Sequence, residues 1–373
     1  MRIAIDARLV SARDIGSSVY CRSLLRALAA GSDGHEYALI CMPLGDGRTQ
    51  LGPRFHWVES PGARLMEEEW EQLALPALLQ ELRPDVYLSL TGVLPAVKAC
   101  PQATIIHDAG VEEEPGFYAT PLFRYLSKWL RAAAGQADLV ITVSRHAAAG
   151  IQRAYGVPRE RMIVASPAAD DIFWPIPGDD ERNEVLDSYG IDGPFLIAVA
   201  AMEPSKNLSA VLDAYRLAGG RAGTGHSLVL VGGAGNAEAL LLRQIGRLGL
   251  ADEVVLTGHV PREHLPALHS AATCFLWASL YEGFGLPPLE AMACGTPVVS
   301  SNRASMPEVL GDAAILVDPA QPAAMAAGLK LVLGSDQVRQ RLRRAGLQQA
   351  AGYSWHQTAQ TILAGMERVA IHE

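Results

Sequence analysis

Short apolar stretches alternate with amphipathic helical stretches along this chain, and the alternation runs through twice. In the first half we predict strands at 3–5, 37–40, 86–88, 103–106 and 139–143, with helices near 17–30, 67–82, 120–136 and 145–154. The second half starts again with strands at 195–199, 227–231, 254–256, 274–276, 297–299 and 314–317. Strands that alternate with helices form parallel sheets from βαβ units. The sequence therefore predicts an α/β protein of two Rossmann-like domains, with parallel sheets facing each other across a cleft.

The stretch between the two halves, residues 166–193, is rich in Pro, Asp and Gly and has no sustained apolar period, which is typical of a linker. We therefore expect a first domain at 1–168, a linker at 169–192 and a second domain at 193–354. Ligands of such sheets bind at the carboxyl ends of the strands, so the loops that follow the strands should carry the site.

The composition fits a globular protein of two domains and disfavours two kinds of partner. The chain has 373 residues, of which 49% are hydrophobic and 19% charged. Its net charge of −9 argues against nucleic acid, because phosphate backbones need dense positive charge. No run of about 18 apolar residues occurs, and the first segment predicts a strand rather than a signal peptide, so we expect no membrane span. The 5 cysteines are scattered without metal-type spacing, which indicates the reduced thiols of a cytoplasmic protein.

The stretch from Glu282 to Glu290 combines a phosphate-binding loop with two carboxylates. Gly283 and Gly285 let the loop bring its amides close to a ligand, and the Pro-Pro pair that follows suits the first turn of a helix. The free amides and positive dipole end at a helix start attract an anion, most often a phosphate. Glu282 precedes the helix and Glu290 lies one turn inside it, so we expect them to contact a sugar and a ribose of one ligand.

This stretch resembles the signature of the retaining glycosyltransferases of family 4 (GT4), in which seven residues separate two glutamates. The resemblance covers nearly the whole chain. Further matches are MRIAIDAR at 1–8, IHD at 106–108, EPSKN at 203–207, TGHVP at 257–261 and YSW at 353–355. The resemblance implies the GT-B architecture, with an acceptor-side first domain and a second domain that binds the nucleotide sugar. It also implies that a last helix, within 355–373, packs back on the first domain.

The resemblance implies a role for each candidate site residue. Lys206, at the mouth of the loop after the strand 195–199, would neutralise the donor diphosphate. Glu282 would hold a hydroxyl of the transferred sugar, Glu290 would hold the ribose, and His107 would contact the donor sugar beside the acceptor. We take His107, Glu282 and Lys206 as the catalytic candidates. The other donor-binding candidates are Gly16 in the first glycine loop, Val260 at the base, and Gly283, Phe284, Gly285 and Leu286 at the phosphates and sugar.

The motifs are most similar to those of bacterial mannosyl- and rhamnosyltransferases of surface polysaccharide assembly, which implies retaining transfer of a hexosyl or deoxyhexosyl unit. GDP-mannose is the leading donor, and the acceptor would be a hydroxyl of a glycan or a lipid-linked saccharide. We expect no cofactor and no metal, because Lys206 and the helix start supply the positive charge. Two alternatives remain open. One is a nucleotide-sugar 2-epimerase, which needs no acceptor; the other is a weakly catalytic binding subunit, suggested by Ser205 in place of a basic residue.

Three basic residues lie on one stripe of the helix predicted at 120–136, namely Arg124, Lys128 and Arg131. The stripe fits a solvated helix face, which we favour, or a contact with an anionic membrane surface or lipid-linked acceptor. We therefore expect a cytoplasmic protein with at most a peripheral contact at the inner face of the cytoplasmic membrane.

Overall fold

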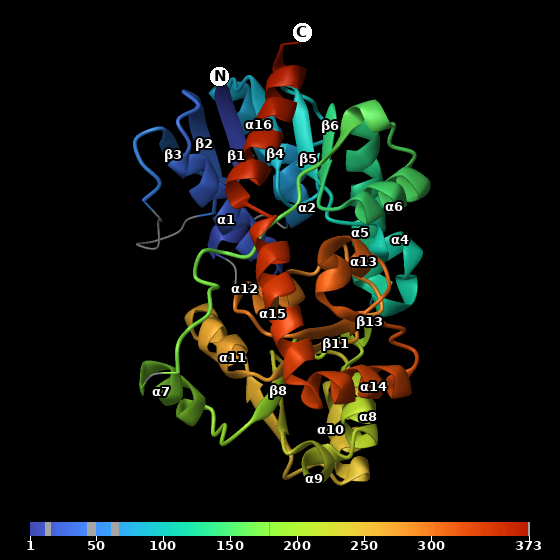
Figure 1. Ribbon diagram of the computed structural model, residues 1–373. Coiled ribbons are helices and arrows are strands. Elements are labelled where there is room, and N and C mark those ends of the chain that lie inside the picture. The colour runs from blue at the N-terminus through green and yellow to red at the C-terminus, as the bar shows by residue number, and fades with distance from the viewer. Residues whose placement is uncertain (12–15, 43–49, 61–66, 119, 179, 372–373) are drawn as a thin grey trace. The chain divides into compact units, whose positions relative to one another are not determined.

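A computed structural model describes residues 1–11, 16–42, 50–60, 67–118, 120–178 and 180–371 (Figure 1). The chain divides into two compact units, the first formed by Met1–Pro167 with Ser354–Glu373 and the second by Ala168–Tyr353. Each unit is built on its own parallel sheet. The predicted α/β class with two Rossmann-like domains is therefore confirmed. Residues 169–192, where we expected a linker, are assigned to the second unit.

The described residues of the first unit form a seven-stranded parallel sheet in the order β3-β2-β1-β4-β5-β6-β7. Its strands are β1 (Arg2–Asp6), β2 (Glu36–Cys41), β3 (Phe55–Glu59), β4 (Val86–Ser89), β5 (Gln102–Ile105), β6 (Leu139–Thr142) and β7 (Met162–Val164). The sequence patterns did not predict β3 and β7. Both strands form edges of the sheet and are mostly only partly buried. In β3 the polar His56 interrupts the apolar residues, and β7 is a short apolar run of three residues, Met162–Val164, that the pattern analysis missed.

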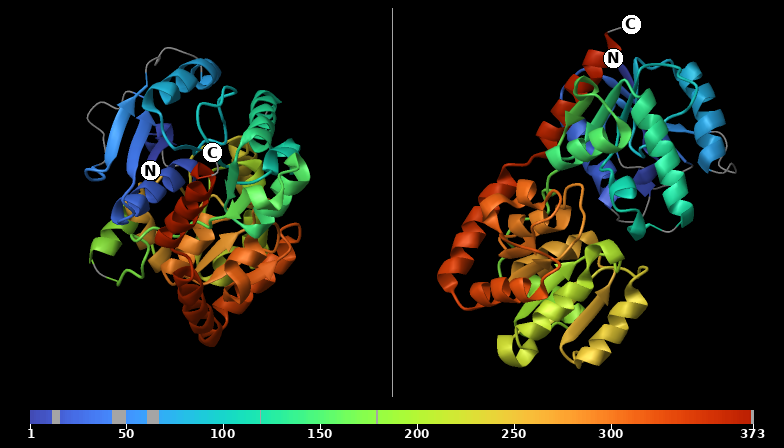
Figure 2. Two further views of the ribbon diagram at one scale, coloured as in Figure 1. Left: turned by 90° about the horizontal axis from the view of Figure 1, so that it is seen from above. Right: turned by 90° about the vertical axis from the view of Figure 1, so that its right-hand side faces the viewer.

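Helices lie along the first sheet, and the C-terminal helix is one of them (Figures 1 and 2). The helical segments are η1 (Arg8–Ser11), α1 (Gly16–Ala30), α2 (Glu67–Glu69), η2 (Trp70–Ala74, π-helical), α3 (Leu75–Leu82), α4 (Gly110–Glu113), η3 (Pro115–Phe117), α5 (Thr120–Gln136), α6 (Arg145–Tyr155), η4 (Arg159–Arg161) and α16 (Trp355–Ala370). The helix α16 packs on α1 and on the strands β4, β6 and β7. Gly365 allows this approach, because a Cβ atom there would lie 2.7 Å from Ile163 Cδ1 and 2.8 Å from Leu139 Cδ2.

The described residues of the second unit form a six-stranded parallel sheet in the order β10-β9-β8-β11-β12-β13. Its strands are β8 (Phe195–Val199), β9 (Ser227–Val231), β10 (Val254–Gly258), β11 (Cys274–Trp277), β12 (Val298–Ser301) and β13 (Ile315–Val317). All of these strands lie where the sequence predicted them, within one or two residues. The central strands β8 and β11 are buried almost throughout, as parallel strands covered on both faces must be.

The hydrophobic core of the second unit lies between its sheet and the helices that cover it. The helical segments are α7 (Asp180–Ser188), η5 (Pro204–Lys206), α8 (Leu208–Leu217), α9 (Gly220–Thr224), α10 (Glu238–Leu248), η6 (Arg262–His264), α11 (Leu265–Ala271), α12 (Leu286–Ala293), α13 (Met306–Leu310), η7 (Gly311–Ala313), α14 (Pro322–Leu333) and α15 (Asp336–Ala351). Side chains of α8, α10 and α14 pack against β8, β9 and β11 in one apolar cluster.

Each sheet has a point at which the strand order reverses. The reversal lies between β1 and β4 in the first sheet and between β8 and β11 in the second. At such a switch point the connections that leave neighbouring strands turn to opposite sides of the sheet, and ligands bind beyond the carboxyl ends of those strands. The loops after β8 and β11 are therefore the expected ligand-binding loops of the second unit.

Candidate functional site

Lys206 and Glu282 meet at the switch point of the second sheet. Lys206 ends η5 in the loop after β8, and Glu282 lies in the loop after β11, the neighbouring strand. Their side chains form an ion pair with 2.7 Å between Nζ and Oε1, and 27% and 14% of the two side chains are exposed. The fold thus brings together the two catalytic candidates of the second unit, at the edge of the sheet where ligands of this architecture bind.

Backbone and hydroxyl contacts tie these two loops together. The carbonyl of Ser205 accepts a hydrogen bond of 2.8 Å from the Leu280 amide. The hydroxyl of Ser279 lies 3.0 Å from the same carbonyl and 2.7 Å from Glu282 Oε1. Ser205, where the family usually has a basic residue, therefore contributes through its backbone, and Glu282 is held from two sides.

The glycine loop leads into the helix α12 as the sequence predicted. Gly285 has a φ of 97° and stands at the N-cap of α12, with proline in the first turn. Side chains rarely adopt this φ, and a Cβ atom at Gly285 would also meet the end of the Met306 side chain, so the position favours glycine. The hydroxyl of Ser305 donates to the Phe284 carbonyl at 2.8 Å and braces the loop. Gly285 has no side chain to cap the helix, and Pro287 and Pro288 have no N–H, so the donors left for an anion at this helix start are the amides of Leu286 and of the loop before it.

Two donor-binding candidates have side chains that point into the protein core. Phe284 is 6% exposed and packs edge-on against Tyr353, with ring centroids 5.4 Å apart. Val260, which follows Gly258 at the end of β10, is 4% exposed. Any ligand contact by these two residues would therefore use their backbone, and that role stays a prediction.

Glu290 is buried on α12 and is held by Arg262, a residue that the sequence analysis missed. Arg262 Nη2 lies 2.7 Å from Glu290 Oε1 and 2.9 Å from Asp170 Oδ2, and the guanidinium lies 4.8 Å from the centre of the Phe173 ring. Burial raises the pKa of Glu290, and Arg262 counteracts part of that rise. A signal for Arg262 was present, since it is the first basic residue after the loop expected to hold the base.

His107 follows β5 in the first unit and is partly buried, with its Nε2 atom enclosed. Burial lowers its pKa to about 4, so its imidazole is neutral at physiological pH. Its Nε2 has no hydrogen-bond partner among the described residues. The Tyr20 ring stands edge-on to it at 5.0 Å, and Trp355 of α16 stands edge-on to Tyr20 at 5.1 Å. Gly16, the first residue of α1, is exposed, and no atom lies within 4 Å of the place where its Cβ would be.

Two family models and a relative from Escherichia coli show to which family this chain belongs. A model described as Glycosyltransferase Family 4 matches residues 16–171, and one described as Glycosyl transferases group 1 matches residues 182–349. O-antigen chain mannosyltransferase B of Escherichia coli is 35% identical over 263 residues, which cover 70% of this chain and 69% of that protein. This chain belongs to glycosyltransferase family 4. The resemblance inferred from the motifs is thereby confirmed, and with it the assignment of the protein as a glycosyltransferase.

Further relatives and solved structures support the fold. Serotype-specific mannosyltransferase WbdA of Escherichia coli is 31% identical over 68% of this chain, but the match covers only 31% of that longer protein. The structure of sucrose-phosphate synthase from Thermosynechococcus elongatus has a TM-score of 0.78 at 19% identity. The superposition covers 99% of this chain and 98% of the synthase chain. The glycosyltransferase WaaG, at 16% identity, has a TM-score of 0.72 over 99% of this chain and 98% of its own. The GT-B fold expected of this glycosyltransferase is thus confirmed.

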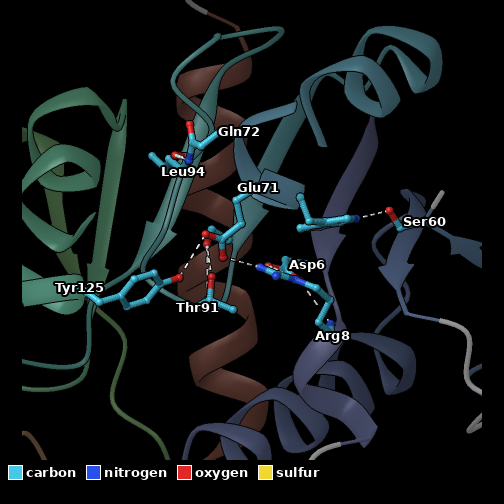
Figure 3. A network of polar contacts seen from close by, with 10 residues as sticks. Asp6, Arg8, Ser60, Glu71, Gln72, Thr91, Leu94 and Tyr125 are labelled. Carbon is cyan, nitrogen blue, oxygen red and sulfur yellow. Dashed lines mark hydrogen bonds and ion pairs between the residues drawn. The ribbon is translucent and has the colours of Figure 1, made fainter. Parts of the chain in front are cut away.

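The glycosyltransferase holds a second buried ion cluster, at the switch point of its first sheet (Figure 3). Arg8 lies between Asp6 and Glu71, with Nη2 at 2.7 Å from Asp6 Oδ2 and 2.9 Å from Glu71 Oε1. Tyr125 donates to Glu71 Oε2 at 3.2 Å, and Arg8 stacks over Trp70 at 4.0 Å. Asp6 and Glu71 are almost fully enclosed, so the cluster braces the loop after β1 rather than exposing a binding surface.

Two of the three basic residues of the stripe on α5, Lys128 and Arg131, form ion pairs inside the first unit. Lys128 Nζ lies 2.7 Å from Glu68 Oε1, and Arg131 Nη2 lies 3.0 Å from Glu112 Oε1. These pairs favour the solvated helix face over a membrane contact. Within the described residues, no helix has the length and apolarity to cross a bilayer.

A cavity of about 480 Å³ lies beside the loop that follows β8 in the second unit. Its walls come from the segment 202–204 and from the helices α8 and α10. Lys206, Glu282 and Glu290 do not line it. The charges at the switch point therefore locate the candidate site better than this hollow does.

Proposed function

We propose that this glycosyltransferase moves a mannosyl unit from GDP-mannose to a hydroxyl of a growing surface glycan or lipid-linked saccharide, with retention of the anomeric configuration. The relatives named as mannosyltransferases support the choice of sugar. The observation that carries the proposal is the pairing of Lys206 with Glu282 beside the glycine loop and the open N-terminus of α12. A cation and helix amides together suit a diphosphate, and a carboxylate suits sugar hydroxyls.

In the proposed mechanism Lys206 turns from Glu282 to the diphosphate of the donor, where the amides at the start of α12 also bind. Glu282 then accepts a hydrogen bond from a hydroxyl of the mannosyl unit, and Glu290 accepts hydrogen bonds from the ribose. The bond between the anomeric carbon and the diphosphate oxygen breaks as the acceptor oxygen attacks from the same face. The departing diphosphate takes the proton of the acceptor hydroxyl, so no separate base is required.

His107 contributes to this reaction as a neutral group. Its lowered pKa keeps the ring uncharged, so it can hold a sugar hydroxyl but does not add positive charge. The proposed reaction uses no metal ion, because Lys206, once it has turned from Glu282, supplies positive charge to the leaving group, while Glu290 keeps its pairing with Arg262. We place the reaction in the cytoplasm, where the buried thiols of this chain would stay reduced.

Ligand binding and turnover test the proposal in two steps. The full-length protein is melted with GDP, UDP, ADP and dTDP, and GDP should raise the melting temperature most, because a ligand that binds only the native state stabilises it. GDP-mannose is then supplied with and without a mannose-containing oligosaccharide acceptor. Transfer that depends on the acceptor is the expected result. Turnover of a UDP-sugar without an acceptor would instead identify an epimerase, and nucleotide binding without any turnover would identify a binding subunit.

A further inference from the structure

Asp170, Arg262 and Glu290 form a buried ion triad in the second unit. The three residues come from separate places in the chain: the segment that opens the unit, the start of η6 and the middle of α12. Arg262 reaches Glu290 Oε1 at 2.7 Å through Nη2, and it reaches Asp170 Oδ2 at 3.0 Å through Nε and 2.9 Å through Nη2. Only 4% of the Glu290 side chain is exposed.

Arg262 is the charge that balances Glu290. Burial raises the pKa of Glu290, Arg262 works in the opposite direction, and Asp170 adds to the rise. His269 of α11 and Cys294 after α12 also lie near the pair, but burial lowers the pKa of His269 to about 3 and raises the pKa of Cys294 to about 12. Both are therefore neutral at physiological pH, and loss of Arg262 would leave a buried carboxylate beside a second one.

The contacts also fix the direction of the carboxylate. Arg262 binds Oε1 of Glu290, and no described residue makes a hydrogen bond to Oε2. Asp170 and the ring of Phe173 hold the guanidinium itself in place. A carboxylate with one oxygen held in this way presents its other oxygen in one direction, which lowers the entropy lost when a ligand binds.

We propose that Arg262 is a positioning residue, which holds Glu290 so that its second oxygen can accept hydrogen bonds from the ribose of the donor. Asp170 and Phe173 support Arg262 in this role. The inference rests on the proposed function, because it requires that Glu290 binds a ribose. It also connects the donor site to Asp170, three residues after the point at which the chain leaves the first unit.

The test measures GDP binding to the full-length protein by calorimetry at pH 6.0, 7.0 and 8.5. Wild type should bind with nearly the same affinity at all three values. Arg262→Met should weaken binding about tenfold or more at pH 6.0, and should recover part of the loss at pH 8.5 as Glu290 ionises. Arg262→Lys should restore most of the affinity and the flat pH profile. At saturating donor, kcat of Arg262→Met should stay within about threefold of wild type.

Two controls separate positioning from general damage. Arg216→Met removes an exposed arginine of α8 in the same unit and should change nothing. Arg262→Met combined with Glu290→Gln should bind no more weakly than Glu290→Gln alone and should lose the pH dependence. The inference is overturned if Arg262→Met binds GDP like wild type, or if it is weakened equally at every pH while Arg262→Lys gives no rescue. If wild type binds none of GDP, UDP, ADP and dTDP, the proposed function falls and this inference falls with it.

Discussion

Glu282 and Glu290, one before α12 and one inside it, each hold a different cation at 2.7 Å. Glu282 is paired with Lys206 in a partly exposed position, whereas Glu290 is paired with Arg262 in the core. The two pairs should therefore respond differently to the donor. A diphosphate can draw Lys206 away from Glu282 because water reaches that pair, but separating Arg262 from Glu290 would leave buried charges unpaired, which is costly.

Lys206→Ala should lose about 2–4 kcal/mol of transition-state stabilisation, a fall of roughly 30- to 1,000-fold in kcat/KM, because the charge on the leaving diphosphate is no longer neutralised. The melting temperature should change little, since a partly exposed ion pair contributes little stability. Steady-state kinetics with the true acceptor measure the effect. Lys330→Ala is the matched control, because Lys330 is an exposed lysine on α14 of the same unit. Wild-type turnover in Lys206→Ala would remove Lys206 from the mechanism.

The two glutamates should give different kinetic signatures. Glu290→Gln should raise KM for the donor with little change in kcat, because a ribose contact is made equally in the ground state and the transition state. Glu282→Gln should lower kcat more than it changes KM, because its contact with the sugar strengthens as positive charge develops there. The same pattern of KM and kcat in both variants would contradict this division of roles.

His269 should make the protein sensitive to acid. Its pKa is about 3 in the folded protein against 6.5 for an ordinary histidine, and neither ring nitrogen has a partner among the described residues. Between these two values the unfolded chain binds more protons, so the free energy of unfolding falls as pH falls from 6.5 towards 3, by up to about 1.4 kcal/mol per pH unit for this residue. His269→Leu should lose that contribution and be less destabilised than wild type at pH 5. Urea unfolding at pH 7, 6 and 5 measures the free energy of unfolding of wild type and His269→Leu. If that free energy falls equally with pH in both proteins, His269 is not a buried neutral imidazole.

Gly365→Ala should loosen α16 from the first sheet. Its Cβ would lie 2.7 Å from Ile163 Cδ1 and 2.8 Å from Leu139 Cδ2, so these packed side chains, or the helix itself, must shift, at a cost of about 1–3 kcal/mol. Gly135→Ala in α5 is the control, because nothing lies within 4 Å of the new Cβ and alanine favours a helix. Thermal unfolding of both variants checks the prediction. A Gly365→Ala variant as stable as Gly135→Ala would show that α16 can move without loss.

The sequence patterns located the central strands, the helix at the glycine loop and most of the candidate residues, because these depend on local order. Buried parallel strands are short apolar runs, and Gly285 followed by two prolines is a helix start that neighbouring residues define. The signal is weaker for the edge strand β3, in which His56 interrupts the apolar residues, and for the helix α7, which has no buried residue. The edge strand β7 is an apolar run of only three residues, Met162–Val164, and was missed although the equally short β13 was found.

By itself the sequence indicated a two-domain α/β protein that resembles the family 4 glycosyltransferases, with one cation and two carboxylates in or near the loops of the second half. The tertiary structure alone decided which charges meet. Lys206 and Glu282 are 76 residues apart, and Arg262 and Asp170 are 92 apart, so their contacts depend on how the sheet orders its strands. Burial was decided at the same level, and it makes His107 neutral and Glu290 dependent on Arg262. Local pattern cannot specify either property, because desolvation and ion pairing arise only when distant segments pack together.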